Sequence, residues 1–319
     1  MFNPFSLRYL ANMKLYLNSL TKQIAFGYGL ILAVFGISLV VTLLELKGVE
    51  ATSAQIKDLR SPTARSGLML LNGVNHSLAA LRGWMLIGHD AEGEKFKVER
   101  KHAWTEEITP SIEDMDRLSE NWTNPENVKR LKSIKSYLKE FESYQISIEQ
   151  IANTEKNREA SRILFSEAVP RAEVLINEIA VMIEIEKTLK ATPKRKYILG
   201  VLADVRGSIG FSLANIRAFL LSGDDKFRLE FEREWKKNDA SFLALALNKE
   251  FLNAKQIIAY EKFSVVRNEF SSFPEKIFKI RGAEDWNKAK FLLKTKAAPI
   301  AFKIKDVISE MIVDQEKLE

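Results

Sequence analysis

The sequence contains no cysteine, few turn-forming residues and only three histidines among its 319 residues. The absence of cysteine excludes a disulfide scaffold, a thiolate metal site and a cysteine nucleophile. Fourteen glycines and eight prolines are few for this length, so long regular elements are expected. The histidines, His76, His89 and His102, lack the spacing of a metal-binding motif, and neither a metal nor another cofactor is predicted.

Catalytic signatures are also lacking. The sequence has no nucleophile elbow and no phosphate-binding glycine loop. Its carboxylates lie on amphipathic stretches, where they usually form a solvated face. We therefore predict that the protein is not an enzyme and assign no catalytic residue. The net charge is +6, but basic and acidic residues are interspersed, so nucleic acid is not an expected partner.

A long uncharged run lies near the start of the chain, from Ile24 to Leu44. In a helix it would extend about 32 Å, which is enough to cross a hydrocarbon core of about 30 Å. A secretory signal peptide is the alternative, but its apolar core is shorter and a small-residue cleavage site follows it. The run here ends in LLELKGVE. We therefore predict an uncleaved transmembrane helix over residues 23–45.

The flanking charges predict the orientation of this helix. Three basic residues and no acidic residue precede it, whereas Glu45, Lys47 and Glu50 follow it. The positive-inside rule places residues 1–22 in the cytoplasm and, in a bacterial inner membrane, residues 46–319 in the periplasm. No second span follows, so we expect either a single-pass anchored ectodomain or a fragment that stops before a second span.

The remainder of the sequence predicts an all-α ectodomain. Apolar residues recur in steps of three or four from Leu71 to Met85 and from Val205 to Leu220. Apolar and polar residues do not alternate with a period of two over any sustained stretch, so no sheet is predicted. At two places we expect one helix to end with a glycine and the next to begin with an acidic N-cap: Gly88 with Asp90, and Gly223 with Asp225. Asn124 is expected to cap a third helix.

The ectodomain also carries an internal repeat. Residues 78–90 align with residues 213–225 at an offset of 135, and the alignment continues at offsets of 131 and 129. Trp104 thereby aligns with Trp235. Apolar stripes alone can align unrelated helices, but the shared arginine, glycine, tryptophan and proline positions lie outside that explanation. We predict a duplication.

Each repeat is predicted to form a four-helix bundle. The first repeat covers about 62–190 and the second about 197–319. The helical segments expected in the first repeat are 62–87, 90–121, 125–155 and 160–190.

This pattern resembles the helical bimodular sensor domain of bacterial methyl-accepting chemotaxis proteins. The residues that carry the resemblance are LRSP at 59–62, LAALRGWMLIG at 78–88, Trp104, Asn-Trp at 121–122 and the segment 206–223. The resemblance covers about residues 20–319. It implies two four-helix modules, a small ligand such as an organic acid, and a homodimer. A full receptor of this family continues into a second span, a HAMP linker and a signalling hairpin, which this chain lacks.

Arginine is the candidate ligand-binding residue, because a small anion between helices needs a charged, bidentate donor. Arg82 and Arg217 occupy equivalent positions beside the two apolar stripes, which predicts one anion site in each module. The alternative is a structural salt bridge or a side chain that extends along the surface. Nearby polar residues that would complete the pockets are Asn75, Ser77, Ser212 and Asn215.

A second candidate site comprises Arg60 and Arg65, soon after the predicted span. Paired arginines at this height resemble the acid-binding arrangement of the family. The alternative is a solvated helix face.

Together these features predict the periplasmic ligand-sensing part of a transmembrane chemoreceptor that acts in signal transduction. Two alternatives remain open: the ectodomain of a sensor histidine kinase, and a single-pass anchored binding or scaffold protein.

Overall fold

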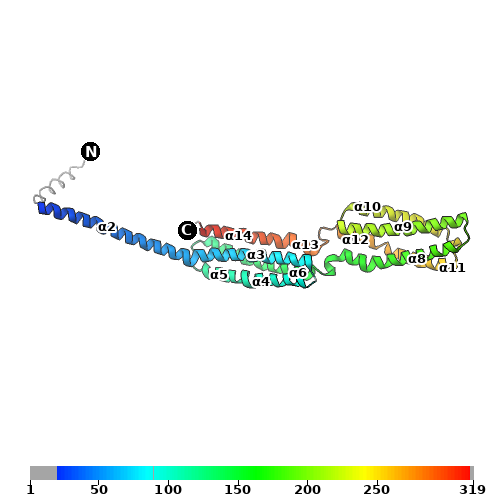
Figure 1. The fold of residues 1–319 in the computed structure, drawn as a ribbon, viewed down its shortest axis with the longest axis horizontal. Coiled ribbons are helices and arrows are strands. Elements are labelled where there is room, and N and C mark those ends of the chain that lie inside the picture. The colour runs from blue at the N-terminus through cyan, green and yellow to red at the C-terminus, as the bar shows by residue number, and fades with distance from the viewer. Residues whose placement is uncertain (1–19, 89, 317–319) are drawn as a thin grey trace, which may run out of the picture. The chain divides into compact units, whose positions relative to one another are not determined.

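The structure, a computed structural model, describes residues 20–88 and 90–316 (Figure 1). Every regular element in these ranges is helical, which confirms the all-α prediction. The α-helices are α2 Leu20–Gln55, α3 Ser61–Ile87, α4 Ala91–His102, α5 Thr109–Ser119, α6 Pro125–Ile151, α7 Glu159–Arg162, α8 Val169–Thr188, α9 Pro193–Ser222, α10 Asp225–Ala246, α11 Ala254–Phe270, α12 Phe273–Gly282, α13 Lys288–Leu292 and α14 Ala298–Glu316. Two 3₁₀ turns, Glu155–Arg158 and Lys249–Phe251, complete the connections.

The described chain divides into two compact units. The first holds residues 20–70, 110–131 and 308–316, and the second holds residues 71–88, 90–109 and 132–307. In the first unit α3, α5 and α14 approach closely at Gly67, where a Cβ atom would lie 3.1 Å from Ile312 and 3.4 Å from Met115. A larger residue at this position would therefore push the helices apart.

Helix α2 is apolar and no residue in it is buried. Large side chains such as Leu32 and Phe35 are 68% and 66% exposed. Two helices in the described ranges are long and apolar enough to cross a membrane: the continuous helix Leu20–Ile87, which begins with α2, and α9. The two differ in burial, because α9 contributes to a packed core whereas the apolar window in α2 is fully exposed.

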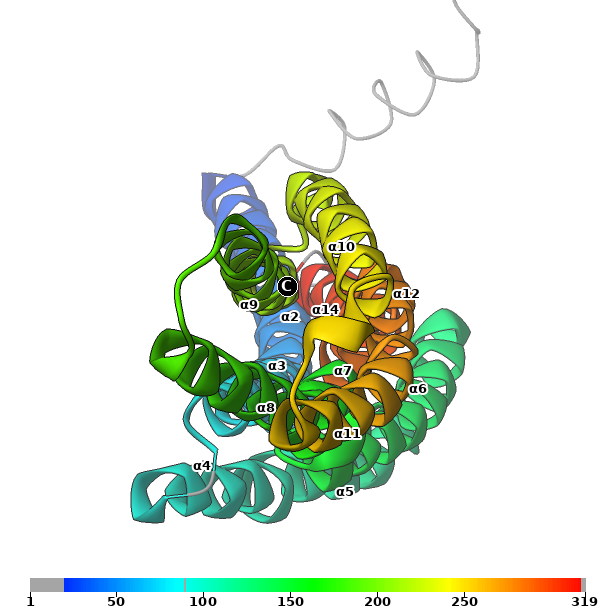
Figure 2. The same cartoon turned by 90° about the vertical axis from the view of Figure 1, so that its right-hand side faces the viewer.

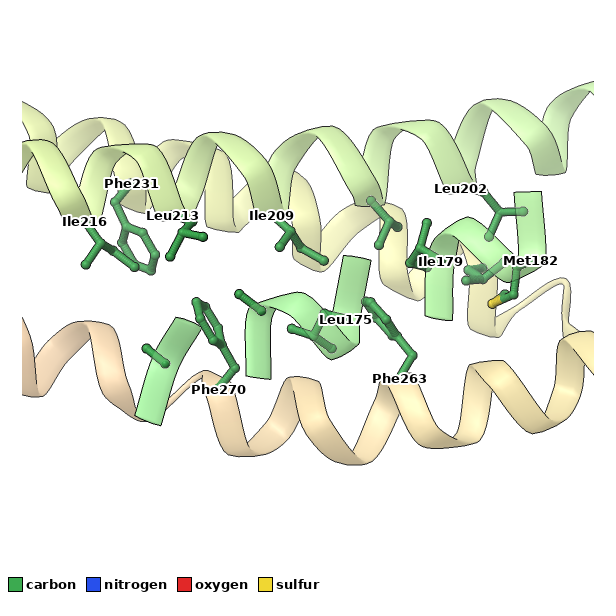
Figure 3. Close-up of a cluster of buried hydrophobic side chains, with 14 of the residues drawn as sticks. Leu175, Ile179, Met182, Leu202, Ile209, Leu213, Ile216, Phe231, Phe263 and Phe270 are labelled. Atoms are coloured by element: carbon green, nitrogen blue, oxygen red, sulfur yellow. The ribbon is translucent and has the colours of Figure 1, made fainter. Parts of the chain in front are cut away.

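The largest core of the second unit lies between α8, α9, α10 and α11 (Figure 3). Figure 2 shows these helices and α12 side by side. The labelled side chains that meet in this core are Leu175, Ile179, Met182, Leu202, Ile209, Leu213, Ile216, Phe231, Phe263 and Phe270. Each such burial contributes about 1.5–3 kcal/mol relative to exposure. The apolar stripe predicted from Val205 to Leu220 is thus largely a core stripe.

The predicted glycine ends and acidic N-caps of the helices are confirmed, except that one N-cap is a different residue. Gly88 and Gly223 have φ values of 72° and 70°, the left-handed conformation that glycine adopts most readily. The carboxylate of Asp90 accepts a hydrogen bond from the backbone of α4. At the equivalent break the N-cap is Asp224, not Asp225, because the Asp224 side chain accepts the bond from the Lys226 backbone at 3.0 Å.

Four widened, π-helical turns interrupt the long helices in the described residues. They are Ile56–Arg60, Ala103–Ile108, Ile163–Ala168 and Leu293–Ala297. Each ends two residues before a proline, namely Pro62, Pro110, Pro170 and Pro299. A proline inside a helix has no N–H to donate, and its ring clashes with the carbonyl four residues earlier. That carbonyl lies within the widened turn every time, so the π turn relieves the clash without ending the helix.

Two tryptophans make equivalent contacts in the predicted repeats. The ring of Trp104 lies 6.2 Å from Phe141, and the ring of Trp235 lies 5.5 Å from Phe270. The members of the two pairs are related by the sequence offsets of 131 and 129. In each pair the tryptophan lies in the helical stretch that follows a glycine break, and the phenylalanine lies in the next long helix.

A second set of corresponding positions carries charged side chains in the first predicted repeat and aromatic side chains in the second. Arg100 and Glu149 form an ion pair with Nη2 and Oε2 2.6 Å apart and with side chains only 7% and 13% exposed. The same offsets carry these residues onto Phe231 and Phe278, whose rings lie 5.2 Å apart at 68°. An ion pair in one predicted repeat therefore corresponds to an aromatic contact in the other.

This exchange predicts a double-variant effect. Arg100→Phe alone leaves the Glu149 carboxylate buried without its cation, which should lower the free energy of unfolding by about 3–5 kcal/mol. Adding Glu149→Phe recreates the ring pair and should restore most of that loss. The measurement is urea unfolding of the full chain in a mild detergent, followed by circular dichroism. A double variant no more stable than Arg100→Phe would contradict the equivalence.

Candidate functional site

Arg60 is the last residue of the π turn that precedes Pro62. Its Nη2 donates a hydrogen bond to Oε1 of Gln55 at 3.3 Å. Its Nη1 is buried and has no hydrogen-bond partner in the part of the chain that the structure describes. A buried guanidinium N–H group that lacks an acceptor is energetically costly, and an anion is the partner that best satisfies it.

Arg60 lines a small pocket of the first unit, of about 20 Å³. The other lining residues are Gln55, Leu59, Trp122, Thr123, Asn124 and Gln315. The Trp122 indole donates to Oγ1 of Thr63 at 3.1 Å, and the Thr63 hydroxyl donates to the Leu59 carbonyl at 2.7 Å. These two hydrogen bonds hold the Trp122 and Leu59 side of the pocket in place. A pocket of this size accommodates about one water-sized group.

A carboxylate that contacts one lining residue of the pocket, Asp314, is already paired. Asp314 accepts hydrogen bonds from Arg130 and from Nδ2 of Asn124, the latter at 3.2 Å. Glu310 lies 3.2 Å from Arg130 as well. The hydrogen bond to Asp314 raises the pKa of Arg130 above its usual value, so this pair remains charged. Asp314 is therefore the ion-pair partner of Arg130 and does not neutralise Arg60.

The other predicted arginines lie on open helix faces. Arg65, Arg82 and Arg217 are exposed, and so is Asn75, whereas Asn215 is half-buried. Within the described ranges, none of these three arginines has a hydrogen bond or an ion pair. The structure therefore does not bring Arg65 into the Arg60 pocket. Anion binding at Arg82 and Arg217 stays a prediction.

The two predicted serines are buried in different surroundings. Oγ of Ser77 accepts a hydrogen bond from Nε2 of Gln145 at 2.9 Å, and Oε1 of Gln145 accepts from the Trp104 indole at 2.8 Å. Oγ of Ser212, at the equivalent position, has no partner among the described residues. The offset of 129 places Pro274 where Gln145 would be, and proline has no side-chain donor. Ser77 is thus part of a structural network.

Several lining residues of the Arg60 pocket were missed by sequence reasoning. Asn-Trp at 121–122 was recognised only as part of the resemblance, and Gln315 carries no signal at all. Pro62 is the signal that was available, because a proline inside a helix predicts a distortion at the residues just before it. That distortion includes Arg60.

His76 forms a separate polar cluster in the second unit. Its Nδ1 lies 2.7 Å from Oε1 of Glu107, and its Nε2 lies 3.3 Å from Oε2 of Glu99. Asn72 donates to the second oxygen of Glu107 at 2.7 Å. The hydrogen bond to Glu107 is the main cause of a raised pKa of His76. The imidazolium is therefore the form that this cluster stabilises.

The raised pKa predicts a pH-dependent stability. A pKa that is higher in the folded state contributes stability that is full below about 6.5 and is lost as the pH rises through the folded value. His76→Gln should therefore cost about 0.2–1 kcal/mol at pH 6 and much less at pH 9. Urea unfolding at both pH values measures this. His102→Gln, at an exposed histidine, is the control and should show no such trend. An equal cost of His76→Gln at both pH values would contradict the prediction.

In comparisons with protein-family models, with curated proteins and with solved structures, nothing matches this chain at a significant level. In residues 20–88 and 90–316 no group of histidine, aspartate and glutamate side chains is arranged to hold a metal ion.

Proposed function

We propose that this chain is the membrane-anchored, ligand-sensing part of a bacterial chemoreceptor, and that Arg60 binds a small carboxylate. The observation that carries the proposal is the buried, unpartnered Nη1 of Arg60 beside a pocket. Arginine recognises carboxylates through charge-assisted hydrogen bonds, and burial strengthens them.

In this proposal α2 is the transmembrane helix. Its apolar side chains have no packing partner in the described chain, and lipid would cover them. The charge bias around the run supports a cytoplasmic N-terminus, with the remaining helices in the periplasm.

The remaining helices are proposed to form two related four-helix modules, as in helical bimodular sensors. Equivalent aromatic contacts support the duplication, since Trp104 with Phe141 corresponds to Trp235 with Phe270. The π turns Ile163–Ala168 and Leu293–Ala297 support it as well, because they end at positions 129 residues apart. We propose a homodimer on the resemblance alone.

The pocket suggests how binding would be coupled to a helix movement. About 20 Å³ is too small for a whole carboxylate, so an organic acid would bind a wider arrangement of the lining residues. Arg60 lies in the same continuous helix as α2, and Gln315 lies in the last turn of α14. A ligand that prefers the wider arrangement would shift the population towards it. Such a shift would move these two helices relative to the membrane.

The test is a thermal-shift screen of the full chain in detergent against organic acids of two to six carbons, followed by calorimetry. Arg60→Gln should weaken the binding of a carboxylate hit at least tenfold, which is about 1.4 kcal/mol. Arg65→Gln, an exposed arginine in the same helix, is the matched control and should bind like the parent chain.

The variants Arg82→Ala and Arg217→Ala separate the candidate sites. If these variants weaken binding and Arg60→Gln does not, the anion binds at the exposed arginines and the Arg60 assignment is wrong. If no carboxylate binds, the proposed ligand class is wrong, and a protein partner becomes the better explanation.

A further inference from the structure

The second unit contains a cavity of about 630 Å³ between the start of α10 and α12. Four aromatic side chains line it: Phe219, Phe231, Trp235 and Phe278. Its volume lies within the range of about 300–1,000 Å³ that is common for small-molecule sites. It is also much larger than the pocket at Arg60, so it admits a whole organic molecule.

Phe278 stands at a steep angle to two other rings of this cavity. Phe278 meets Phe219 at 82° with centroids 5.0 Å apart, and it meets Phe231 at 68° with centroids 5.2 Å apart. Trp235 stacks on Phe231 at 14°. Rings set at right angles present faces and edges to one volume, and ring faces attract cations through their quadrupole.

In the first repeat, an ammonium group of the chain itself lies over the ring that corresponds to Phe219. Trp84 corresponds to Phe219 at the offset of 135, and Nζ of Lys97 lies 4.0 Å from the centroid of the Trp84 ring. The residue that corresponds to Lys97 is Arg228, which instead forms ion pairs with Asp225 at 3.2 Å and Glu232 at 3.0 Å. In the described part of the chain, no lysine or arginine lies over Phe219.

The rim of the cavity carries a surplus of negative charge. Its carboxylates are Asp225, Glu232 and Glu275, and its basic groups are Arg228 and Lys279. Two of the carboxylates already hold Arg228, so the protein's own cation is kept at the rim. Arg267 lies over the Trp235 ring at 4.9 Å from its centroid, so the rings left for a cation from outside, among the described residues, are those of Phe219, Phe231 and Phe278.

We infer that this cavity binds a small organic cation of the quaternary ammonium type. Such a cation needs no hydrogen bonds, is attracted by aromatic rings, and gains from the acidic rim. In the first repeat Lys97 supplies the ammonium group within the chain, whereas in the second repeat the ligand supplies it. The inference does not depend on the proposed carboxylate site, because the two sites share no residue.

The experiment is calorimetry of the full chain, solubilised in a maltoside detergent, with choline as the probe. The matched uncharged probe is 3,3-dimethylbutan-1-ol, which has the same shape with carbon in place of the charged nitrogen. We expect choline to bind about tenfold tighter than the alcohol. Phenylalanine, an aromatic zwitterion, serves as the competing ligand class and should not bind.

Variants place the binding in this cavity. Phe278→Leu keeps an apolar side chain of similar size but removes a ring, and it should weaken choline binding about tenfold. Glu275→Gln, at the exposed rim, should weaken it about threefold without altering the fold. Glu261→Gln is the matched control, because this exposed glutamate lies in α11 and outside the cavity.

Three results would overturn the inference. Choline fails to bind the parent chain, choline and the uncharged alcohol bind equally, or phenylalanine binds in place of choline. If Phe278→Leu unfolds the chain, Glu275→Gln still decides the location. Unchanged choline affinity in that variant would overturn the assignment to this cavity.

Discussion

A proline within a long helix withholds one backbone hydrogen bond, and residues 20–88 and 90–316 meet that constraint in the same way four times. Pro62, Pro110, Pro170 and Pro299 each follow a widened turn, and the helix then continues. The consequence reaches beyond the backbone, because a widened turn changes the direction of the side chains it carries. Arg60 ends the first of these turns and is the one predicted arginine with a buried, unpartnered guanidinium nitrogen.

The two predicted repeats differ in the side chains that surround their buried polar groups. Around Trp104 the first repeat satisfies its polar atoms internally, with Gln145 bonded to Ser77 and Arg100 paired with Glu149. In the second repeat proline and phenylalanine occupy the corresponding positions. The aromatic contacts that result are apolar, and they border a cavity with a charged rim. The ion pair of the first predicted repeat thus corresponds to an aromatic contact beside a cavity in the second.

The proposed sites use these two features separately. At Arg60 one guanidinium nitrogen, Nη1, is buried without a hydrogen-bond partner among the described residues, which favours an anion. In the aromatic cavity the chain's cation is held at the rim by Asp225 and Glu232, which favours a cation. A sensor with both sites would respond to ligands of opposite charge, one in each of its two compact units.

The sequence alone determined the helical class, the uncharged run and most helix ends. These depend on local properties: spacing of apolar residues, side-chain caps such as Asn124, and the conformational freedom of Gly88 and Gly223. Only the tertiary structure decided which arginine has a buried guanidinium nitrogen. Arg60, Arg65, Arg82 and Arg217 all lie in helices, and helical spacing does not say what packs against each face. Exposure of the last three follows from where the neighbouring helices lie, whereas the pocket beside Arg60 is lined by Trp122 and Gln315, which are far away in sequence.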